Sequence, residues 1–253
     1  MPKNVVITGA SSGIGEALAE RFASQGYNLG LAARSVDKLD LLAEKLLQQY
    51  SVRIETVSLD VNDDASIPAV LDDLAKRLGS VDILVANAGI AGSRRSGTNN
   101  LSVDKAVFQT NLIGAIATLD AATKLFLAQG HGHLVGISSV SAFTPIPKSA
   151  AYSASKAALT NYMNAMRLEL AGNNINVTVI HPGFINTHLA PKMDKYPFVI
   201  NADVAAKQMV HAIERKQTNP IIPALPWKGV KALLQIMPDS LMTIVMKNMG
   251  SKK

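Results

Sequence analysis

Thr8-Gly9-Ala10-Ser11-Ser12-Gly13-Ile14-Gly15 follows the short apolar run Asn4–Thr8 and opens a helical pattern over Gly13–Gln25. Glycines in such a turn let the backbone approach a phosphate, and free N–H groups at a helix N-terminus attract the anion. The spacing differs from G-x-G-x-x-G and lacks the Gly-Lys-Ser/Thr ending of a P-loop, so an ordinary tight turn is the alternative. The strand–turn–helix context favours a dinucleotide site. Its predicted contacts are Gly9, Ser11, Ser12, Gly13, Ile14 and Gly15.

Short β-branched runs alternate with longer helical patterns along the rest of the chain, which is typical of βαβ units and a mostly parallel sheet. The predicted strands are Asn4–Thr8, Asn28–Ala32, Arg53–Ser58, Ile83–Asn87, His133–Ser138 and Asn176–His181, with a seventh candidate at Pro220–Pro223. The predicted helices are Gly13–Gln25, Val36–Gln49, Ala65–Leu78, Ser102–Leu127, Ala151–Leu170 and Ala202–Arg215. The carboxyl ends of the strands are expected to line the ligand crevice.

Composition indicates one α/β domain, because 253 residues with 48% hydrophobic side chains can bury a substantial core. The chain contains no cysteine, which excludes disulfides, thiolate catalysis and cysteine zinc sites. Polar residues soon follow the N-terminus, so neither a signal peptide nor an anchor is expected there. No apolar run is expected to span a bilayer, and a cytoplasmic location is predicted.

The chain is basic, with a net charge of +6 and an isoelectric point near 9.5. The basic residues are scattered and not interleaved with aromatic residues, so we expect no nucleic-acid partner. A phosphorylated cofactor would account for part of the excess. His131 and His133 lack acidic or cysteine companions and are expected to be loop residues, so no metal site is predicted.

Tyr152 and Lys156 stand four residues apart in a predicted helix, thirteen or more positions after Ser139. That spacing places phenol and ammonium on one face, where the cation can make the phenol more acidic. A tyrosine so placed is a candidate general acid or base. A Tyr and a Lys at this spacing also occur by chance on many amphipathic helices.

Together with the glycine turn, Asn87-Ala88-Gly89, Ser139, Tyr152-x-x-x-Lys156 and Pro182-Gly183 resemble the short-chain dehydrogenase/reductase family in order and spacing. The resemblance covers about residues 3–215. It implies one doubly wound Rossmann-type domain over residues 1–224, with a seven-stranded, mainly parallel sheet and helices on both faces. It also implies an oxidoreductase that transfers hydride between a nicotinamide and a carbonyl or alcohol.

The resemblance assigns four catalytic positions. Tyr152 would protonate the carbonyl oxygen, and Lys156 would lower the Tyr152 pKa and hold the nicotinamide ribose. Ser139 would orient the substrate oxygen, in preference to Ser138, because adjacent residues on a strand point to opposite faces. Asn111 would hold a water in a proton relay, although a mid-helix Asn can instead bond a neighbouring carbonyl.

Cofactor choice depends on the end of the second strand, where Ala33 stands at the position of an acidic NAD-binding residue and Arg34 follows. Arginine can neutralise a 2′-phosphate, so NADP(H) is preferred and NAD(H) stays an alternative, since Ser12 replaces a second basic residue of many NADP-binding relatives. Asp37 is predicted to be a helix-start residue. The resemblance adds further cofactor contacts: Asp60, Val61, Asn87, Ala88, Gly89, Tyr152, Lys156, Pro182, Gly183, Ile185 and Thr187. Asp60 has the alternative of a helix cap.

The loops 142–149 and 189–201 would line a pocket for an apolar or aromatic carbonyl or alcohol substrate, through Phe143, Ile146, Phe184, Leu189, Tyr196 and Phe198. The pattern of the C-terminal extension, 225–253, predicts two amphipathic helices broken near Pro238. It would pack on the core or on a subunit partner, cover the pocket, or lie on a membrane surface. A homodimer or homotetramer is expected. A non-catalytic dinucleotide sensor or scaffold and an NAD-linked alcohol dehydrogenase are the alternative functions.

Overall fold

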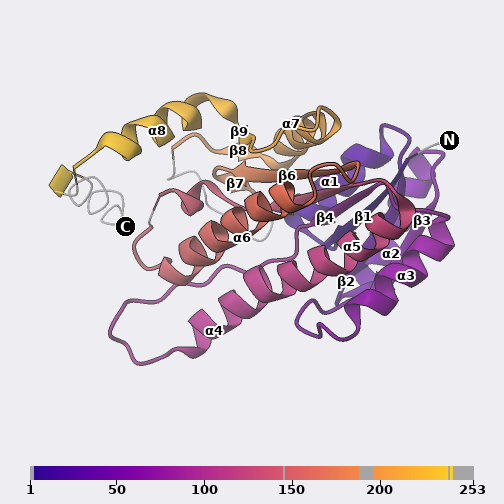
Figure 1. Ribbon diagram of the computed structural model, residues 1–253, viewed down its shortest axis with the longest axis horizontal. Coiled ribbons are helices and arrows are strands. Elements are labelled where there is room, and N and C mark those ends of the chain that lie inside the picture. The colour runs from indigo at the N-terminus through magenta and orange to yellow at the C-terminus, as the bar shows by residue number, and fades with distance from the viewer. Residues whose placement is uncertain (1–2, 145, 188–196, 239, 242–253) are drawn as a thin grey trace.

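The computed structural model describes residues 3–144, 146–187, 197–238 and 240–241, with strands and helices alternating along the chain (Figure 1). The strands are β1 (Asn4–Thr8), β2 (Asn28–Ala33), β3 (Ile54–Ser58), β4 (Ile83–Ala86), β5 (Gly132–Ile137), β6 (Ile175–Pro182), β7 (Ile185–Asn186), β8 (Ile200–Asn201) and β9 (Ile221–Ile222). The helices are α1 (Gly13–Ala23), α2 (Val36–Gln49), α3 (Ile67–Leu78), α4 (Ser102–Phe108), α5 (Ala115–Gln129), α6 (Ala150–Glu169), α7 (Ala202–Glu214) and α8 (Ala224–Ile236).

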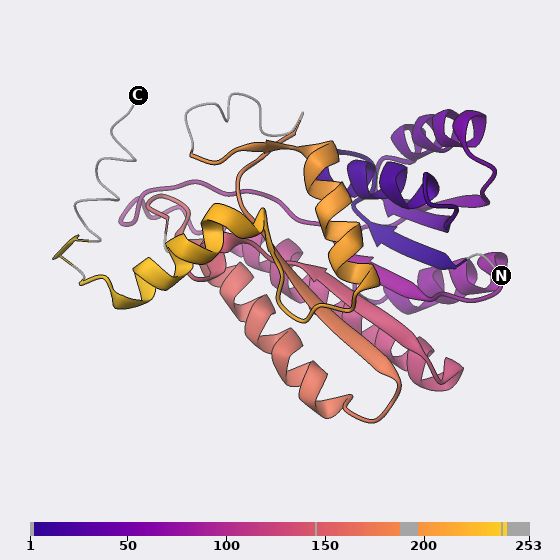
Figure 2. The same ribbon diagram turned by 90° about the horizontal axis from the view of Figure 1, so that it is seen from above.

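Seven strands form one parallel sheet in the order β3-β2-β1-β4-β5-β6-β9. The predicted doubly wound, Rossmann-type sheet is therefore confirmed, and the candidate seventh strand is present as β9. The order reverses between β1 and β4, where the chain crosses from one half of the sheet to the other. Ligands bind outside the carboxyl ends of strands at such a switch point. In Figure 2 the β1 arrow points away from the N-terminus, toward the side that carries the loops and α8.

Helices cover both faces of the sheet and close two separate cores. On one face α1, α2 and α7 bury residues such as Leu18, Leu39 and Met209 against β1 and β2. On the other face α3, α5 and α6 bury residues such as Leu74 and Phe126. Because both faces are buried, strands such as β1, β4 and β5 are buried along their whole length.

The predicted helix over Ser102–Leu127 is one continuous helical run, but it contains a π-helical segment, η1 (Gln109–Gly114), that the sequence pattern does not show. By length and composition alone, Ser102–Gln129 is the one helix among the described residues that could cross a membrane. That differs from the expectation that no such run exists. Its inner side chains Val107, Leu119 and Phe126 are buried, so it is a core helix of this domain.

The C-terminal extension begins as α8, and the backbone turns extended at Met237, immediately before Pro238. The predicted break near Pro238 is thus confirmed, since proline cannot continue a helix. The second predicted helix lies outside the described residues. Two further short elements were not predicted: the parallel pair β7–β8 and the 3-10 helix η2 (Val140–Ala142).

His133 is a buried residue of β5, so the predicted strand His133–Ser138 is correct in including it and the expectation of a loop residue is wrong. Its Nε2 lies 2.8 Å from Thr178 Oγ1, and Thr178 Oγ1 donates to the carbonyl of Gln217 at 2.7 Å. Thr178 therefore accepts from a protonated Nε2. Burial lowers the pKa of His133 to about 4. Within the described part of the chain no group of three or more possible ligands could hold a metal ion.

This histidine predicts a specific loss of stability in acid. The unfolded chain binds a proton at His133 below about pH 6.5 and the folded chain only below about pH 4, so stability falls as the pH drops through that window. His133→Asn should remove about 3 kcal/mol of this pH dependence. Urea unfolding at pH 7 and pH 4.5 measures it, with exposed His131→Asn as the control. Equal pH dependence in wild type and His133→Asn contradicts the prediction.

Candidate active site

The glycine turn between β1 and α1 has the close backbone approach that a phosphate site needs. Gly9 and Gly13 have φ values of +66° and +63°, which favour glycine. A Cβ on Gly9 would lie 2.8 Å from Ala88 Cα, and a Cβ on Gly15 would lie 2.3 Å from the Gly9 carbonyl oxygen. The turn is thus folded onto the start of α1 and onto the segment after β4, and the helix N-terminus faces the sheet edge.

Asn87 joins the two halves of this crevice. Its Nδ2 donates to the carbonyl oxygens of Thr8 at 2.9 Å and Gly9 at 3.1 Å. In return, Thr8 Oγ1 accepts from the backbone N–H groups of Asn87 at 3.1 Å and Ala88 at 3.3 Å. The Asn87 carboxamide is engaged in shaping the turn, so this residue would act on a nucleotide through the backbone it holds.

The glycine turn fits the diphosphate of a dinucleotide. Ser11, Ser12, Gly13 and Ile14 are all partly exposed, and the Ser12 hydroxyl makes no capping hydrogen bond to α1. The first N–H groups of a helix have no partner within it, so they are available to an anion. A Cβ at Gly9 would collide with the backbone of Ala88, and one at Gly15 with the carbonyl oxygen of Gly9, so the tight folding of this turn explains why glycines stand there.

The end of β2 presents a free cation. Ala33 is buried, whereas Arg34 is exposed and has no hydrogen-bond or ion-pair partner among the described residues. Asp37 lies in the first turn of α2, as predicted for a helix-start residue. Beyond the end of the neighbouring strand β3, Asp60 Oδ1 accepts from the Asn62 N–H at 3.0 Å and closes a turn. Helix α3 begins only at Ile67, so the alternative of a helix cap at Asp60 is not seen. Val61 is buried beside Gly114 of η1.

The predicted catalytic residues Ser139, Tyr152 and Lys156 come together at the carboxyl end of β5. Lys156 Nζ donates to the carbonyl of Ile137 at 2.7 Å and lies 5.8 Å from the centroid of the Tyr152 ring. The Ser139 side chain acts on the Tyr152 phenol and partly offsets the rise in its pKa that burial causes. Burial of Lys156 lowers the pKa of its amine to about 8. One cluster therefore combines the buried Ser139 and Lys156 with a half-buried Tyr152, and its amine can exchange a proton near neutral pH.

The Tyr152 phenol is not made more acidic in this structure, contrary to the expectation. Burial is the largest effect and raises its pKa, and the hydrogen bond to Ser139 offsets this only in part. Lys156 directs its ammonium to the Ile137 carbonyl instead of the phenol oxygen. A phenol with a raised pKa keeps its proton, which suits a proton donor.

Asn111 lies fully buried in η1 and holds the loop that follows β4. Its Nδ2 donates to the carbonyl of Ile90 at 2.8 Å, and its Oδ1 accepts from the Ile90 N–H at 2.7 Å. The carbonyl that Asn111 bonds thus belongs to a residue distant in sequence and not to its own helix. Gly89 lies between this amide and the active-site amine: a Cβ there would be 3.2 Å from Asn111 Oδ1 and 3.6 Å from Lys156 Nζ.

Two residues that lie beside Ser139 support the segment that carries it. Ser138 Oγ contacts the Lys156 carbonyl at 3.0 Å, so it is a structural hydroxyl, as expected. His181 was not predicted: it is buried, and its Nδ1 lies 3.3 Å from the carbonyl oxygen of Ser139. Burial is the main cause that lowers the His181 pKa, so the ring is neutral and Nδ1–H can donate. The signal in the sequence that could have found His181 was its position immediately before the predicted cofactor contact Pro182.

The end of β6 and the segment after it lie beside the predicted catalytic cluster, because β6 pairs with β5, the strand that leads into Ser139. Pro182 and Ile185 are buried, and the Gly183 N–H donates to the carbonyl of Ile222 at 2.8 Å. Thr187, at the end of the described part of this segment, is partly exposed. The predicted contacts of a nicotinamide thus come from one strand end that β9 supports.

The predicted substrate residues form an aromatic group around a residue that sequence reasoning missed. Phe184 and Phe198 pack edge to face against Trp227 of α8, with ring centroids 5.4 and 6.1 Å apart. Phe143 belongs to the same apolar cluster, and Ile146 is partly buried. The remaining predicted residues, Leu189 and Tyr196, lie outside the described residues. As the sole tryptophan of the chain, Trp227 was a signal available in the sequence.

The loop between β4 and α4 was also missed, although it borders this region. The Arg94 N–H donates to the carbonyl of Lys148 at 2.8 Å, which joins this loop to the predicted substrate loop 142–149. The Arg94 guanidinium pairs with Asp104 of α4. The two loops therefore form one continuous rim.

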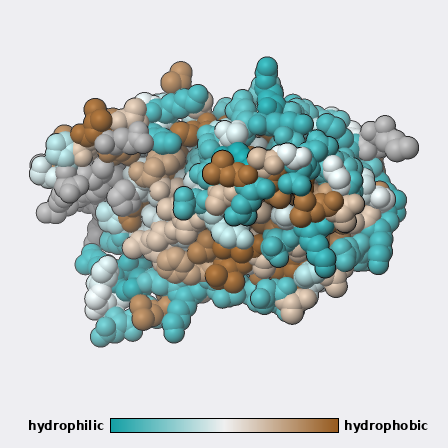
Figure 3. Space-filling view, viewed as in Figure 1, coloured by the Kyte–Doolittle hydropathy of each residue, from teal (hydrophilic) through white to brown (hydrophobic). Residues whose placement is uncertain are grey.

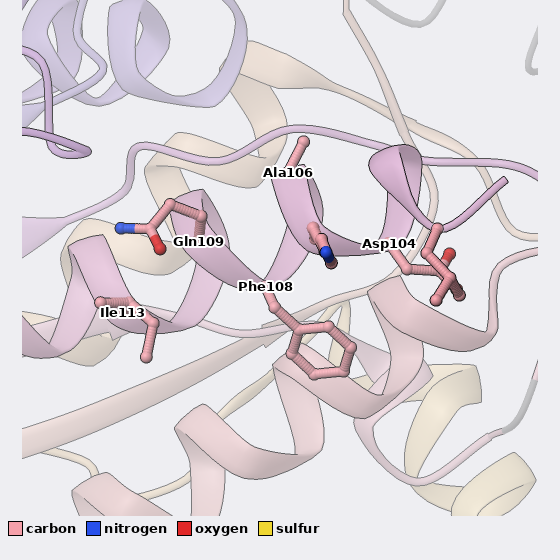
Figure 4. Close-up of a pocket in the computed structure, with 7 residues that line it drawn as sticks. Asp104, Ala106, Phe108, Gln109 and Ile113 are labelled. Atoms are coloured by element: carbon pink, nitrogen blue, oxygen red, sulfur yellow. The ribbon is translucent and has the colours of Figure 1, made fainter.

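An apolar groove lies apart from the catalytic cluster, along the outer side of α4 and η1 (Figure 4). Its hydrophobic lining includes the exposed side chains Leu101, Phe108 and Ile113. Figure 3 shows hydrophobic residues gathered on this face, over α4–α5 and α6. None of the predicted catalytic residues lines the groove, so it is a surface feature and not the reaction site.

Fold and site together define a Rossmann-type oxidoreductase, and the comparisons agree. The family model for short chain dehydrogenase matches residues 3–196. An uncharacterised oxidoreductase of Mycobacterium tuberculosis is 37% identical over 94% of this chain and 95% of its own length. The chain therefore belongs to the short-chain dehydrogenase family.

Two further relatives are named by activity. 11-beta-hydroxysteroid dehydrogenase 1A of Arabidopsis thaliana is 34% identical, over 94% of this chain and 73% of its own. An alcohol dehydrogenase from the archaeon Thermococcus sibiricus, solved in complex with 5-hydroxy-NADP, superposes with a TM-score of 0.79. It is 28% identical and covers 87% of this chain and 96% of its own.

The contact between Gly15 and the Gly9 carbonyl yields a test of the cofactor site. Gly15→Ala should lower NADPH affinity at least ~10-fold, because the added methyl must push the turn away from α1. Fluorescence titration with NADPH measures the affinity. Gly229→Ala in α8 is the matched control, because nothing lies within 4 Å of that Cβ, and it should bind as wild type does. Unchanged affinity in Gly15→Ala would show that the turn does not hold the nucleotide.

Proposed function

We propose that this chain is an NADPH-dependent reductase that converts a carbonyl to an alcohol, or catalyses the reverse reaction. The observation that carries the proposal is the cluster of half-buried Tyr152 with the buried side chains of Ser139 and Lys156, in which Lys156 Nζ lies 5.8 Å from the Tyr152 ring centroid. It stands at the sheet edge next to a glycine turn suited to a diphosphate. A sensor or scaffold without turnover would have no need of a buried amine, which is costly to desolvate.

In the proposed reduction, the cofactor supplies the hydride to the carbonyl carbon. Ser139 holds the substrate oxygen near the Tyr152 hydroxyl, which donates its proton as charge develops on that oxygen. Lys156, with a pKa of about 8, returns a proton to the phenolate and would hold the nicotinamide ribose. Asn111 keeps the loop beside Lys156 in place through Ile90 and is the proposed site of the relay water. Alcohol oxidation runs these proton steps in reverse.

NADP(H) is the proposed cofactor because of Arg34, whose exposed guanidinium follows β2, has no partner among the described residues and has Ala33 in place of an acidic neighbour. A guanidinium there can pair with a 2′-phosphate. The similar archaeal alcohol dehydrogenase was solved with an NADP derivative, which supports this choice. NAD(H) is the weaker alternative cofactor.

An apolar or aromatic carbonyl compound is the proposed substrate class. Phe143, Phe184 and Phe198 support it, as does the likeness to a hydroxysteroid dehydrogenase. A homodimer or homotetramer is proposed, supported by the exposed apolar side chains Phe108 and Ile113 on α4 and η1. The cytoplasm is the proposed location, which the lack of cysteine supports.

The proton donor is tested by removing one oxygen atom. Tyr152→Phe should lower carbonyl-dependent NADPH oxidation at least ~10²-fold, because general acid catalysis contributes about that much or more. A panel of aldehydes, diketones and steroids is assayed at 340 nm, and NADPH affinity should be nearly unchanged. Tyr162→Phe, on the same helix, is the control with wild-type turnover expected. Wild-type turnover in Tyr152→Phe would rule out the mechanism.

Arg34 is tested by reversing its charge. Arg34→Asp should weaken NADPH binding relative to NADH by about 10- to 100-fold, since a hydrogen bond to a charged group contributes about 1.5–3 kcal/mol. Titrations with both reduced cofactors measure the ratio. Arg215→Asp, at the end of α7, changes the net charge equally and should leave the ratio unchanged. The same ratio in wild type and Arg34→Asp would show that another group selects the cofactor.

A further inference from the structure

Helix α8 lies largely at the surface, yet it carries one deeply buried residue. Leu225, Leu233 and Ile236 are 81%, 54% and 80% exposed, whereas Trp227 is 4% exposed. A large aromatic side chain buried in this way contributes strongly to packing. Trp227 is therefore the point at which the C-terminal helix is anchored to the domain.

The residue on which Trp227 packs is Gly183, in the turn that follows β6. A Cβ on Gly183 would lie 2.2 Å from Trp227 Nε1 and 2.7 Å from Cε2, so the edge of the indole rests on the glycine backbone. Gly183 also donates its N–H to the carbonyl of Ile222. Strand β9 and helix α8 thus hold the same residue from two sides.

A second line of contacts leads from Trp227 to the catalytic serine. Trp227 shares a buried cluster with Val140, the neighbour of Ser139, and with Phe143. The ring of Phe143 lies 5.5 Å from that of His181, and His181 Nδ1 contacts the Ser139 carbonyl. The indole therefore packs behind both the Gly183 turn and the segment that carries Ser139.

The indole nitrogen shows whether a hydrogen bond or packing holds Trp227 against Gly183. Trp227 Nε1 is buried and has no hydrogen-bond partner among the residues that the structure describes. The contact with Gly183 therefore depends on the shape of the ring and not on a hydrogen bond. A phenylalanine would keep much of that packing, and an alanine would remove it.

We propose that Trp227 is a positioning residue for the proposed reaction: the indole, packed on Gly183 and beside Val140, fixes the turn after β6 relative to Ser139. The inference rests on the proposed function, because the positioned groups are those that would meet the nicotinamide and the substrate oxygen. Small displacements of such groups lower turnover strongly while leaving distant cofactor contacts intact. Through Trp227, helix α8 becomes part of the reaction site although it contributes none of the four predicted catalytic residues.

The test compares Trp227→Ala and Trp227→Phe with Leu233→Ala, an exposed position of the same helix. Trp227→Ala should lower kcat about 10-fold or more, and change the NADPH Kd less than about 3-fold. Trp227→Phe should stay within about 3-fold of wild type, and Leu233→Ala should match it. Thermal unfolding monitors whether each variant is folded. Wild-type kcat in Trp227→Ala, or equal losses in Trp227→Phe and Trp227→Ala, would overturn the proposal.

A second measurement keeps the proposal testable if Trp227→Ala does not fold. Gly183→Ala inserts a methyl at the indole edge, so it should shift the fluorescence of the sole tryptophan and lower kcat, and Trp227→Phe should relieve part of the kcat loss. Unchanged emission, or no relief, contradicts the proposal. Failure of the proposed function is distinguishable, because wild type would then turn over no carbonyl, and that result overturns both.

Discussion

The hydrogen bonds of Asn87 to the Thr8 and Gly9 carbonyls are the constraint on which the rest of the site depends. They connect the ends of β1 and β4, the two strands between which the sheet order reverses. Such a reversal opens a crevice, and the open backbone groups of a glycine turn need partners to stay folded there. Because the Asn87 amide supplies them, the turn can present the N-terminus of α1 to an anion without a ligand to shape it.

A second polar connection fixes the catalytic cluster. Lys156 of α6 donates to the Ile137 carbonyl of β5, and Ser138 contacts the Lys156 carbonyl. Helix and strand are therefore joined at the point where Ser139 and Tyr152 meet. Burial acts on the two titratable groups in opposite directions: it lowers the pKa of Lys156 to about 8 and raises that of Tyr152. Both shifts favour the neutral form, which leaves a phenol ready to donate and an amine able to exchange protons.

The outer parts of the structure converge on this cluster from regions far apart in the chain. Asn111 reaches the loop after β4 through Ile90, and Arg94 joins that loop to Lys148. Trp227 reaches Gly183 from α8. Each contact crosses between elements that share no local pattern, and each supports backbone at the carboxyl edge of the sheet. The predicted catalytic residues are thus few, but the residues that hold them are spread over the whole fold.

Local patterns in the sequence determined the class of fold, nearly every strand and helix, the glycine turn and the placing of Tyr152 and Lys156 on one helix face, while the family resemblance added Ser139 to that pair. Those features depend on periodicity and short spacings, which each segment expresses by itself. Only the tertiary structure decided that Asn111 bonds Ile90, that a π-helical segment carries it, that Trp227 rests on Gly183, and that the Tyr152 pKa rises. The physical reason is that burial, close approach and long-range hydrogen bonds arise only when distant segments pack, so spacing along the chain does not encode them.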